Sequence, residues 1–253
     1  MDRPLYDIVE FGVKSMNSVL IIGSSNSVSR ELAELYASQG YNLILTWNNS
    51  EPDEDLINKI RNKYKVNVKS LKLNLMDFIN HKPFCDSILK DLDGVVTTSG
   101  YYPDPMRARE ETDELIKCIY INYLGLCSVI NIISNEFEKR RKGFIIGISS
   151  VSGGRGRGKN YIYGSSKSGF TTYLSGLRNR LNYSGVHVMT VIPGFIRKDG
   201  EKKYFSCTAN KLAKTIITSQ QNRKDVIYVK WYWKYILILI NAIPEFIFKR
   251  TNI

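Results

Sequence analysis

The stretch of sequence that decides the fold is SVLIIGSSNSVSR, residues 18–30. Its first half is a continuous apolar run of strand length. A serine-rich turn follows, and then a helical pattern that places Leu32, Leu35 and Tyr36 on one side. A strand, a short turn and a helix in this order predict the first unit of an α/β fold.

The same alternation continues along the chain. Further strand-like runs lie at residues 41–47, 66–73, 94–97, 143–148 and 186–192, with helical stretches between them. Continuous apolar strands separated by helices indicate a parallel sheet that is buried on both faces. We therefore predict one Rossmann-type, doubly wound parallel sheet of about seven strands, whose ligands bind beyond the carboxyl ends of the strands. This domain is expected at residues 18–229, after a leader at 1–17 and before an aromatic, apolar helix and tail at 230–253.

Length and composition agree with one well-filled domain, because the chain has 253 residues and is 43% hydrophobic. The N-terminus lacks the apolar core of a signal peptide. The four cysteines form no C-x-x-C pair, which predicts small core residues in a reducing cytoplasm and neither a disulfide framework nor a metal site.

The net charge of +12 is spread unevenly, since the segment from Arg197 onward holds twelve Lys and Arg against four Asp and Glu. This asymmetry fits an anionic partner such as a phosphate, a nucleic acid or a membrane surface, and it fits a basic solvated face equally well. No aromatic-basic motif for nucleic acid is present, so nucleic acid is not expected as a partner.

Tyr163 and Lys167 carry the clearest chemical signal in the chain. Residues four apart lie on the same face of a helix, so the phenol is expected beside the ammonium. A nearby cation favours the phenolate and lowers the pKa of a tyrosine, which suits general acid/base work on a carbonyl or an alcohol. Ser150 precedes this pair by thirteen residues.

The order and spacing of these motifs resemble the short-chain dehydrogenase/reductase family, from about Ser18 to Gly194. The family's glycine-rich turn maps onto residues 22–29, with serine at two of its three glycine positions. Thr97-Thr98-Ser99-Gly100 corresponds to the family's segment after the fourth strand, and Ile192-Pro193-Gly194 corresponds to its Pro-Gly turn.

The resemblance implies a catalytic set of Asn122, Ser150, Tyr163 and Lys167. Tyr163 would donate a proton to the substrate oxygen, Ser150 would hydrogen-bond that oxygen, and Lys167 would hold the nicotinamide ribose. Asn122 would position a water that relays protons to Lys167. The cofactor-binding residues implied are Gly23, Ser25, Ser27, Val28, Arg30, Trp47, Asn48, Asn74, Ser99, Gly100, Tyr163, Lys167, Pro193 and Gly194. The serines of the turn are expected to crowd the pyrophosphate.

The preferred cofactor is predicted to be NADP(H), with NAD(H) as the alternative. An acid at the end of the second strand would repel a 2′-phosphate, and none occurs before Glu51. Arg30 matches a position where NADP-preferring relatives carry a basic residue. A solvated helix residue is the competing interpretation of Arg30.

The substrate is indicated by two features. The loop at 152–160 has three basic residues, four glycines and no acid, so Arg155 and Arg157 are candidates for binding a phosphate, unless the loop is merely solvated. Tyr102 is expected to form a pocket wall. The C-terminal stretch 230–244 looks like that of reductases acting on polyprenyl-linked or cell-surface sugars. Its aromatic and lysine residues suit a membrane interface, whereas its apolar character equally suits packing on the substrate pocket or on a dimer partner.

The function predicted is that of an NADPH-dependent ketoreductase acting on a phosphate-, nucleotide- or polyprenyl-phosphate-bearing sugar or polyol in cell-surface polysaccharide synthesis. The alternatives are a reductase of acyl, steroid-like or xenobiotic ketones, and a non-catalytic NADP(H)-binding regulator. The family resemblance implies a homodimer or homotetramer. A cytoplasmic location is expected from the cysteines, with membrane contact through the C-terminal helix as an alternative.

Overall fold

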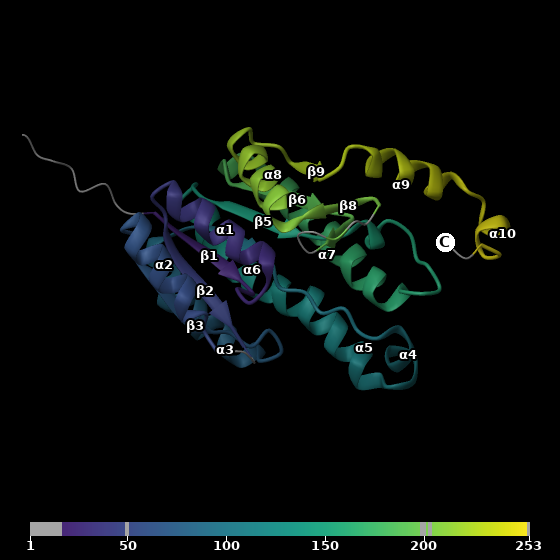
Figure 1. Ribbon diagram of the computed structural model, residues 1–253, viewed down its shortest axis with the longest axis horizontal. Helices are drawn as coiled ribbons and strands as arrows, with labels where there is room; N and C mark the ends of the chain where they lie inside the picture. Colours follow the sequence, from purple (N-terminus) through teal and green to yellow (C-terminus); the bar gives the residue numbers. More distant parts are fainter. Residues whose placement is uncertain (1–16, 49–50, 198–200, 202–203, 252–253) are drawn as a thin grey trace, which may run out of the picture.

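The computed structural model describes residues 17–48, 51–197, 201 and 204–251. It contains the predicted sheet, in which seven parallel strands follow the order β3-β2-β1-β4-β5-β6-β9 (Figure 1). These strands are β1 (Ser18–Ile22), β2 (Asn42–Trp47), β3 (Val68–Lys72), β4 (Leu92–Thr97), β5 (Phe144–Ile148), β6 (His187–Ile192) and β9 (Val226–Tyr228). A separate parallel pair is formed by β7 (Phe195–Arg197) and β8 (Ser206–Thr208). The predicted leader lies outside the described residues, except for Asn17.

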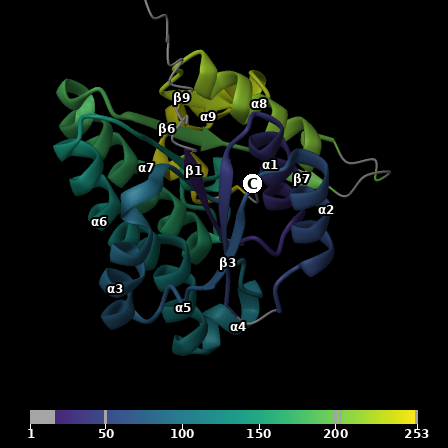
Figure 2. The same ribbon diagram turned by 90° about the vertical axis from the view of Figure 1, so that its left-hand side faces the viewer.

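Helices cover both faces of the sheet (Figure 2). One face carries α1 (Ser27–Ser38), α2 (Glu54–Tyr64) and α8 (Ala209–Gln221), and the other carries α3 (Phe78–Ile88), α6 (Gly125–Lys139) and α7 (Tyr161–Leu181). The strands are apolar throughout because alternate residues enter different cores. In β1, Val19 and Ile21 pack with α1, while Leu20 and Ile22 pack with α6.

Short elements connect these layers. They are α4 (Pro105–Glu110), α5 (Thr112–Ile119), the π-helical turn η2 (Tyr120–Leu124) and the 3₁₀ turns η1 (Leu89–Asp91), η3 (Val151–Gly153) and η4 (Asn182–Ser184). The helical run Thr112–Lys139 is long and apolar enough to cross a membrane, with a mean hydropathy of 1.6. Its residues Leu126, Val129 and Ile133 are fully buried in the core beside the sheet, so core packing accounts for its apolar character.

The chain ends in two helices, α9 (Tyr232–Ala242) and α10 (Glu245–Phe248), which lie along one end of the molecule (Figure 1). Helix α9 buries Trp233 and Leu237 against Val151 and Ile192. The C-terminal segment therefore packs on the loops that follow β5 and β6.

Candidate active site

Two cavities lie at the carboxyl ends of the central strands and meet at Ser99 and Gly100. The first, here called the Tyr163 cavity, has a volume of about 630 Å³ and is also lined by Ser150 and Lys167. The second, the Trp47 cavity, has a volume of about 380 Å³ and is lined by the first turn and the end of β2. Strand order turns in opposite directions on the two sides of β1, which is where doubly wound sheets bind ligands.

The catalytic candidates converge in the Tyr163 cavity. Helix α7 supplies Tyr163 and Lys167. Ser150 lies two residues after the end of β5 and shares a hydrogen bond with the Tyr163 phenol. Ser150 is held by the N–H of Ser152, which donates to its Oγ at 3.1 Å. The Lys167 ammonium donates to the carbonyl of Ile148 at 3.1 Å and lies 5.9 Å from the centre of the Tyr163 ring.

Burial dominates the protonation of this pair. It raises the pKa of Tyr163 to about 12, opposed in part by the hydrogen bond with Ser150. It also lowers the pKa of Lys167 to about 8. The prediction that the pKa of the phenol lies below its ordinary value is therefore wrong for this arrangement, because the loss of water around Tyr163 raises that pKa.

Asn122 joins the same site from the π-helical turn, a geometry that often occurs at functional positions. A Cβ atom on Gly100 would lie 3.7 Å from Asn122 Oδ1 and 3.8 Å from Lys167 Nζ, so the two side chains border one space. Both polar atoms of the Asn122 amide bind the backbone of Tyr101: Nδ2 donates to its carbonyl and Oδ1 accepts its N–H, each at 2.7 Å. Asn122 thereby fixes the loop that follows β4.

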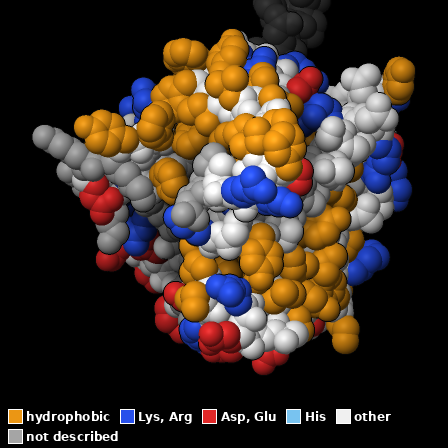
Figure 3. All heavy atoms as spheres, turned by 90° about the vertical axis from the view of Figure 1, so that its right-hand side faces the viewer, with side chains coloured by type: hydrophobic (Ala, Val, Ile, Leu, Met, Phe, Trp, Pro, Cys, Tyr) orange, Lys and Arg blue, Asp and Glu red, His pale blue; other side chains and the backbone are white. Residues whose placement is uncertain are grey.

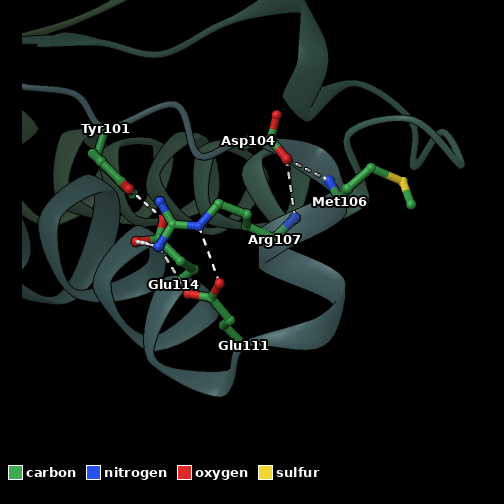
Figure 4. A network of polar contacts seen from close by, with 6 residues as sticks. All are labelled: Tyr101, Asp104, Met106, Arg107, Glu111 and Glu114. Atoms are coloured by element: carbon green, nitrogen blue, oxygen red, sulfur yellow. Dashed lines mark hydrogen bonds and ion pairs between the residues drawn. The ribbon is translucent and has the colours of Figure 1, made fainter.

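A polar network beyond Tyr101 holds this loop from the other side (Figure 4). The Tyr101 hydroxyl donates to the buried carboxylate of Glu114, which Arg107 approaches to 3.7 Å. The next residue, Tyr102, sets its ring edge-on against Tyr163 with centres 4.8 Å apart. Tyr102 also lines the Tyr163 cavity.

The first turn is shaped by close backbone contacts. Gly23 has φ of +91°, and a Cβ atom there would come within 2.7 Å of the Ser99 backbone, so only glycine fits. Its N–H donates to Thr46 Oγ1 at 3.0 Å. Asn26 caps α1 by accepting the N–H of Ser29 at 3.0 Å. The Ser29 hydroxyl in turn accepts the N–H of Asn26 at 3.2 Å and donates to its carbonyl at 2.6 Å.

This capping box explains one of the two serines that replace glycines. The Ser29 hydroxyl is buried and turned back into the turn. The expected crowding of the pyrophosphate therefore does not arise at Ser29. Ser27 and Val28, whose N–H groups have no partner within the helix, line the Tyr163 cavity and remain suited to an anion.

Comparison with known proteins agrees with this geometry. The family model described as short chain dehydrogenase matches residues 17–208. The chain belongs to the short-chain dehydrogenase family. It is therefore an oxidoreductase that acts on the CH–OH/C=O pair.

The similar proteins include oxidoreductases of several bacteria. An uncharacterized oxidoreductase of Mycobacterium tuberculosis is 24% identical over 92% of this chain and 96% of its own length. The 3-oxoacyl-(acyl-carrier-protein) reductase of Aquifex aeolicus is 28% identical over 71% of this chain and 74% of its own length. A short-chain dehydrogenase from Sphingobium yanoikuyae, solved in complex with NADPH, superimposes with a TM-score of 0.79 at 19% identity, covering 91% of this chain and 97% of that one.

Two of the predicted cofactor-binding residues lie away from both cavities of this short-chain dehydrogenase. Arg30 forms an ion pair with Asp53 at 2.5 Å, because Asp53, which caps α2, stands beside α1. Asn74 accepts the N–H of Met76 at 3.0 Å, and its side chain is used in that local turn. The remaining predicted cofactor residues, Gly23, Ser25, Ser27, Val28, Trp47, Asn48, Ser99, Gly100, Tyr163, Lys167, Pro193 and Gly194, all line one or both cavities.

The two arginines of the loop at 152–160 have different positions. Arg157 lines the Tyr163 cavity and donates to Ser152 Oγ at 3.1 Å. Arg155 instead donates to the carbonyls of Ile240 and Ile243 and pairs with Glu245 at 2.8 Å. The prediction that Arg155 binds substrate is wrong, since the last carbonyls of a helix lack partners and attract a cation.

Sequence reasoning missed three further groups of the site. Asn26 was recognisable as a cap, because asparagine before a helical pattern is a start signal. Asn160 and Trp233 line the Tyr163 cavity without any local signal. Among the buried side-chain atoms of the described residues, Trp47 Nε1, Trp233 Nε1 and Asn160 Oδ1 are three that have no hydrogen-bond partner.

Proposed function

We propose that this short-chain dehydrogenase is an NADP(H)-dependent ketoreductase. The observation that carries the proposal is the meeting of Ser150, Tyr163 and Lys167 in one cavity that continues into the glycine turn of β1. The preference for NADP(H) is supported by the absence of an acid among the described residues that line the Trp47 cavity, and by the NADPH complex of the Sphingobium yanoikuyae relative.

The proposed chemistry divides between cofactor and chain. NADPH, when bound, supplies the hydride. Tyr163 gives its proton to the carbonyl oxygen, and Ser150 hydrogen-bonds the same oxygen as negative charge develops on it. Lys167, whose pKa of about 8 leaves it largely protonated at neutral pH, stabilises the phenolate left on Tyr163.

The direct test compares Tyr163→Phe with Tyr161→Phe. Tyr161 lies on the same first turn of α7 but is half exposed and outside the Tyr163 cavity, so it is a matched control. Removing a general acid lowers turnover by about 10²- to 10⁴-fold. We expect that loss in NADPH oxidation for Tyr163→Phe only, with NADPH binding retained in both. Binding of NADPH without turnover of any carbonyl compound by the unaltered protein would favour a regulator instead.

For the substrate, the first candidate remains a sugar or polyol ketone carrying phosphate, nucleotide or polyprenyl phosphate in cell-surface polysaccharide synthesis. Its support is now Arg157, the one arginine among the described residues that lines the cavity. For such substrates, Arg157→Gln is expected to raise KM by about 10-fold, since charge-assisted hydrogen bonds contribute about 1.5–3 kcal/mol. Arg157→Lys should recover part of that loss. An unchanged KM in Arg157→Gln removes this candidate.

A second candidate is an acyl ketone. The apolar residues Val151, Phe195, Ile196 and Trp233 also line the cavity, and the Aquifex aeolicus relative is a 3-oxoacyl reductase by name. Turnover of a 3-oxoacyl thioester with a KM that is insensitive to Arg157→Gln would decide for this candidate.

Membrane contact is proposed through the outer face of the C-terminal helices. Figure 3 shows hydrophobic side chains gathered over this end of the molecule. The exposed apolar and aromatic residues of α9 and α10 include Tyr235, Ile238, Leu239, Phe246 and Ile247. The exposed Lys234, Lys249 and Arg250 lie in the same segment, a combination suited to an anionic interface. Co-sedimentation with vesicles of anionic phospholipid tests this, and Leu239→Glu should abolish it.

A homo-oligomer is proposed through the outer face of α6 and α7. A groove of about 650 Å³ runs there beside Ser168, Gly169 and Gly176, small residues that would admit a second helix pair. Gly176 is a suitable site for a test substitution, because a Cβ atom there would meet nothing within 4 Å of the same chain. Gly176→Arg should convert the assembly to a monomer in light scattering. A monomeric unaltered protein would contradict the proposal.

A further inference from the structure

Helix α9 forms part of the wall of the Tyr163 cavity. Its buried side chains Trp233 and Leu237 pack with Val151, the residue after Ser150. Two glycines permit this approach: a Cβ atom on Gly194 would lie 2.2 Å from Trp233 Nε1, and one on Gly154 would lie 2.7 Å from Leu237. The helix therefore rests directly on the loops that follow β5 and β6.

The loop after Ser150 also holds the far end of α9. Arg155 donates to the carbonyls of Ile240 and Ile243, the latter at 2.7 Å, and its guanidinium lies 3.7 Å over the Phe248 ring. Its side chain is only 15% exposed, so the contact is well shielded. Since α9 is fixed at both ends by this loop, Trp233 has a set position relative to Ser150.

The indole N–H of Trp233 is left without an acceptor in this position. Trp233 lines the Tyr163 cavity, is 8% exposed, and its Nε1 has no hydrogen-bond partner among the described residues. An indole nitrogen can only donate, and burying a donor without a partner costs free energy. A ligand oxygen that comes within hydrogen-bond distance of this nitrogen, which packs against Gly194 at the cavity wall, would remove that cost.

We propose that the Trp233 N–H donates a hydrogen bond to a carbonyl-type oxygen of the molecule bound in the Tyr163 cavity, so that α9 completes the binding site. That oxygen belongs either to the nicotinamide carboxamide or to the ketone substrate. Arg155 is a positioning residue that acts through α9. This inference rests on the proposed function, because the two candidate oxygens belong to the cofactor and the substrate of a ketoreductase.

Nuclear magnetic resonance of the indole groups tests the hydrogen bond directly. The chain has three tryptophans, so the full-length protein gives three indole N–H signals, which Trp233→Phe and Trp231→Phe assign. Trp231 is 74% exposed at the start of the same helix and serves as the internal control. Trp47 lines the other cavity and reports whether cofactor is bound.

Adding NADP⁺ first and acetoacetyl-CoA second distinguishes a cofactor oxygen from a substrate oxygen. A downfield shift of the Trp233 proton on adding NADP⁺ assigns the bond to the cofactor. A shift only after acetoacetyl-CoA is added to the NADP⁺ complex assigns it to the ketone. If Trp47 responds while Trp233 moves no more than Trp231 in both mixtures, the inference is overturned and the proposed function stands. If no signal responds to NADP⁺, the proposed function fails together with it.

Binding measurements give a second readout. Trp233→Phe should weaken NADPH or ketone binding by about 2- to 10-fold, the effect of losing one neutral hydrogen bond, and Trp231→Phe should not. Arg155→Ala should raise the dissociation constant of the same ligand and leave turnover at saturation unchanged. Arg155→Lys should restore the binding. Equal binding by Trp233→Phe and the unaltered protein contradicts the inference. Thermal melting monitors the folding of each variant. If Trp233→Phe does not fold, the indole N–H shifts of the unaltered protein test the inference.

Discussion

The Tyr163 cavity and the Trp47 cavity meet at Gly100 but depend on different parts of the chain. In the first, side chains carry the chemistry: the hydroxyls of Ser150 and Tyr163 and the ammonium of Lys167 line one space. In the second, the backbone matters most, since Gly23 lies against Ser99 and its N–H bonds to Thr46. The substitutions tolerated at the Tyr163 cavity are therefore limited by the chemistry of its side chains. Those tolerated at the Trp47 cavity are limited by the space around its backbone.

This difference explains which glycines of the turn could be replaced. Ser29 is accommodated because its hydroxyl returns to the backbone of Asn26. Gly23 has no such freedom, because its φ is positive and Ser99 occupies the space where a side chain would go. A turn can thus depart from a glycine motif and keep its shape.

The largest effect is expected for Gly23→Ala. A left-handed conformation costs a non-glycine residue about 1–2 kcal/mol, and forcing a methyl group into packed space adds about 1–3 kcal/mol. Gly40→Ala is the matched control, since Gly40 has φ of +82° but nothing within 4 Å of its Cβ position. Urea unfolding should show a loss of about 4 kcal/mol for Gly23→Ala and about 1 kcal/mol for Gly40→Ala. Equal losses would mean that contact with Ser99 is unimportant.

An intermediate effect is expected from the pH dependence of stability at Lys167. Its pKa is lowered by burial from 10.5 to about 8, so between these values the unfolded chain binds more protons than the folded one. Stability should therefore rise with pH in this window, and the penalty for burying the ammonium is complete below pH 8.

The measurement is the difference in unfolding free energy between the unaltered protein and Lys167→Met. The unaltered protein should gain up to about 3 kcal/mol relative to this variant between pH 8 and pH 10. Lys214→Met, which removes an exposed lysine, should show no such difference. A flat difference for Lys167→Met would show that Lys167 is not held away from water.

The smallest effect is expected at the ion pair between Arg30 and Asp53, outside both cavities. Asp53→Asn removes the charge that holds Arg30 but keeps a side chain able to cap α2. If Arg30 is available to a 2′-phosphate, this change should tighten NADPH binding relative to NADH by about 2- to 5-fold, consistent with the small free energy of exposed ion pairs. Arg30→Ala should shift the same ratio the opposite way. No change in either variant would leave Arg30 as a surface residue paired with Asp53.

Prediction from sequence succeeded where the signal was local or periodic. Continuous apolar runs located six strands of the sheet, and spacing along one helix brought Tyr163 and Lys167 together. It failed for the direction of the Tyr163 pKa, because burial is a property of the packed molecule and not of the spacing. It also failed for Arg155, whose partners lie more than eighty residues away.

The sequence by itself determined the layered fold and the residue types of the candidate catalytic set, since strand periodicity and helical spacing are local properties of the chain. Only the tertiary structure decided which arginine of the loop at 152–160 lines the Tyr163 cavity. Arg155 and Arg157 have the same charge and are each flanked by two glycines, but the carbonyls at the end of α9 lie beside Arg155. The same packing brought Trp233 to the site, because two glycines left room for a helix seventy residues further along the chain than Tyr163.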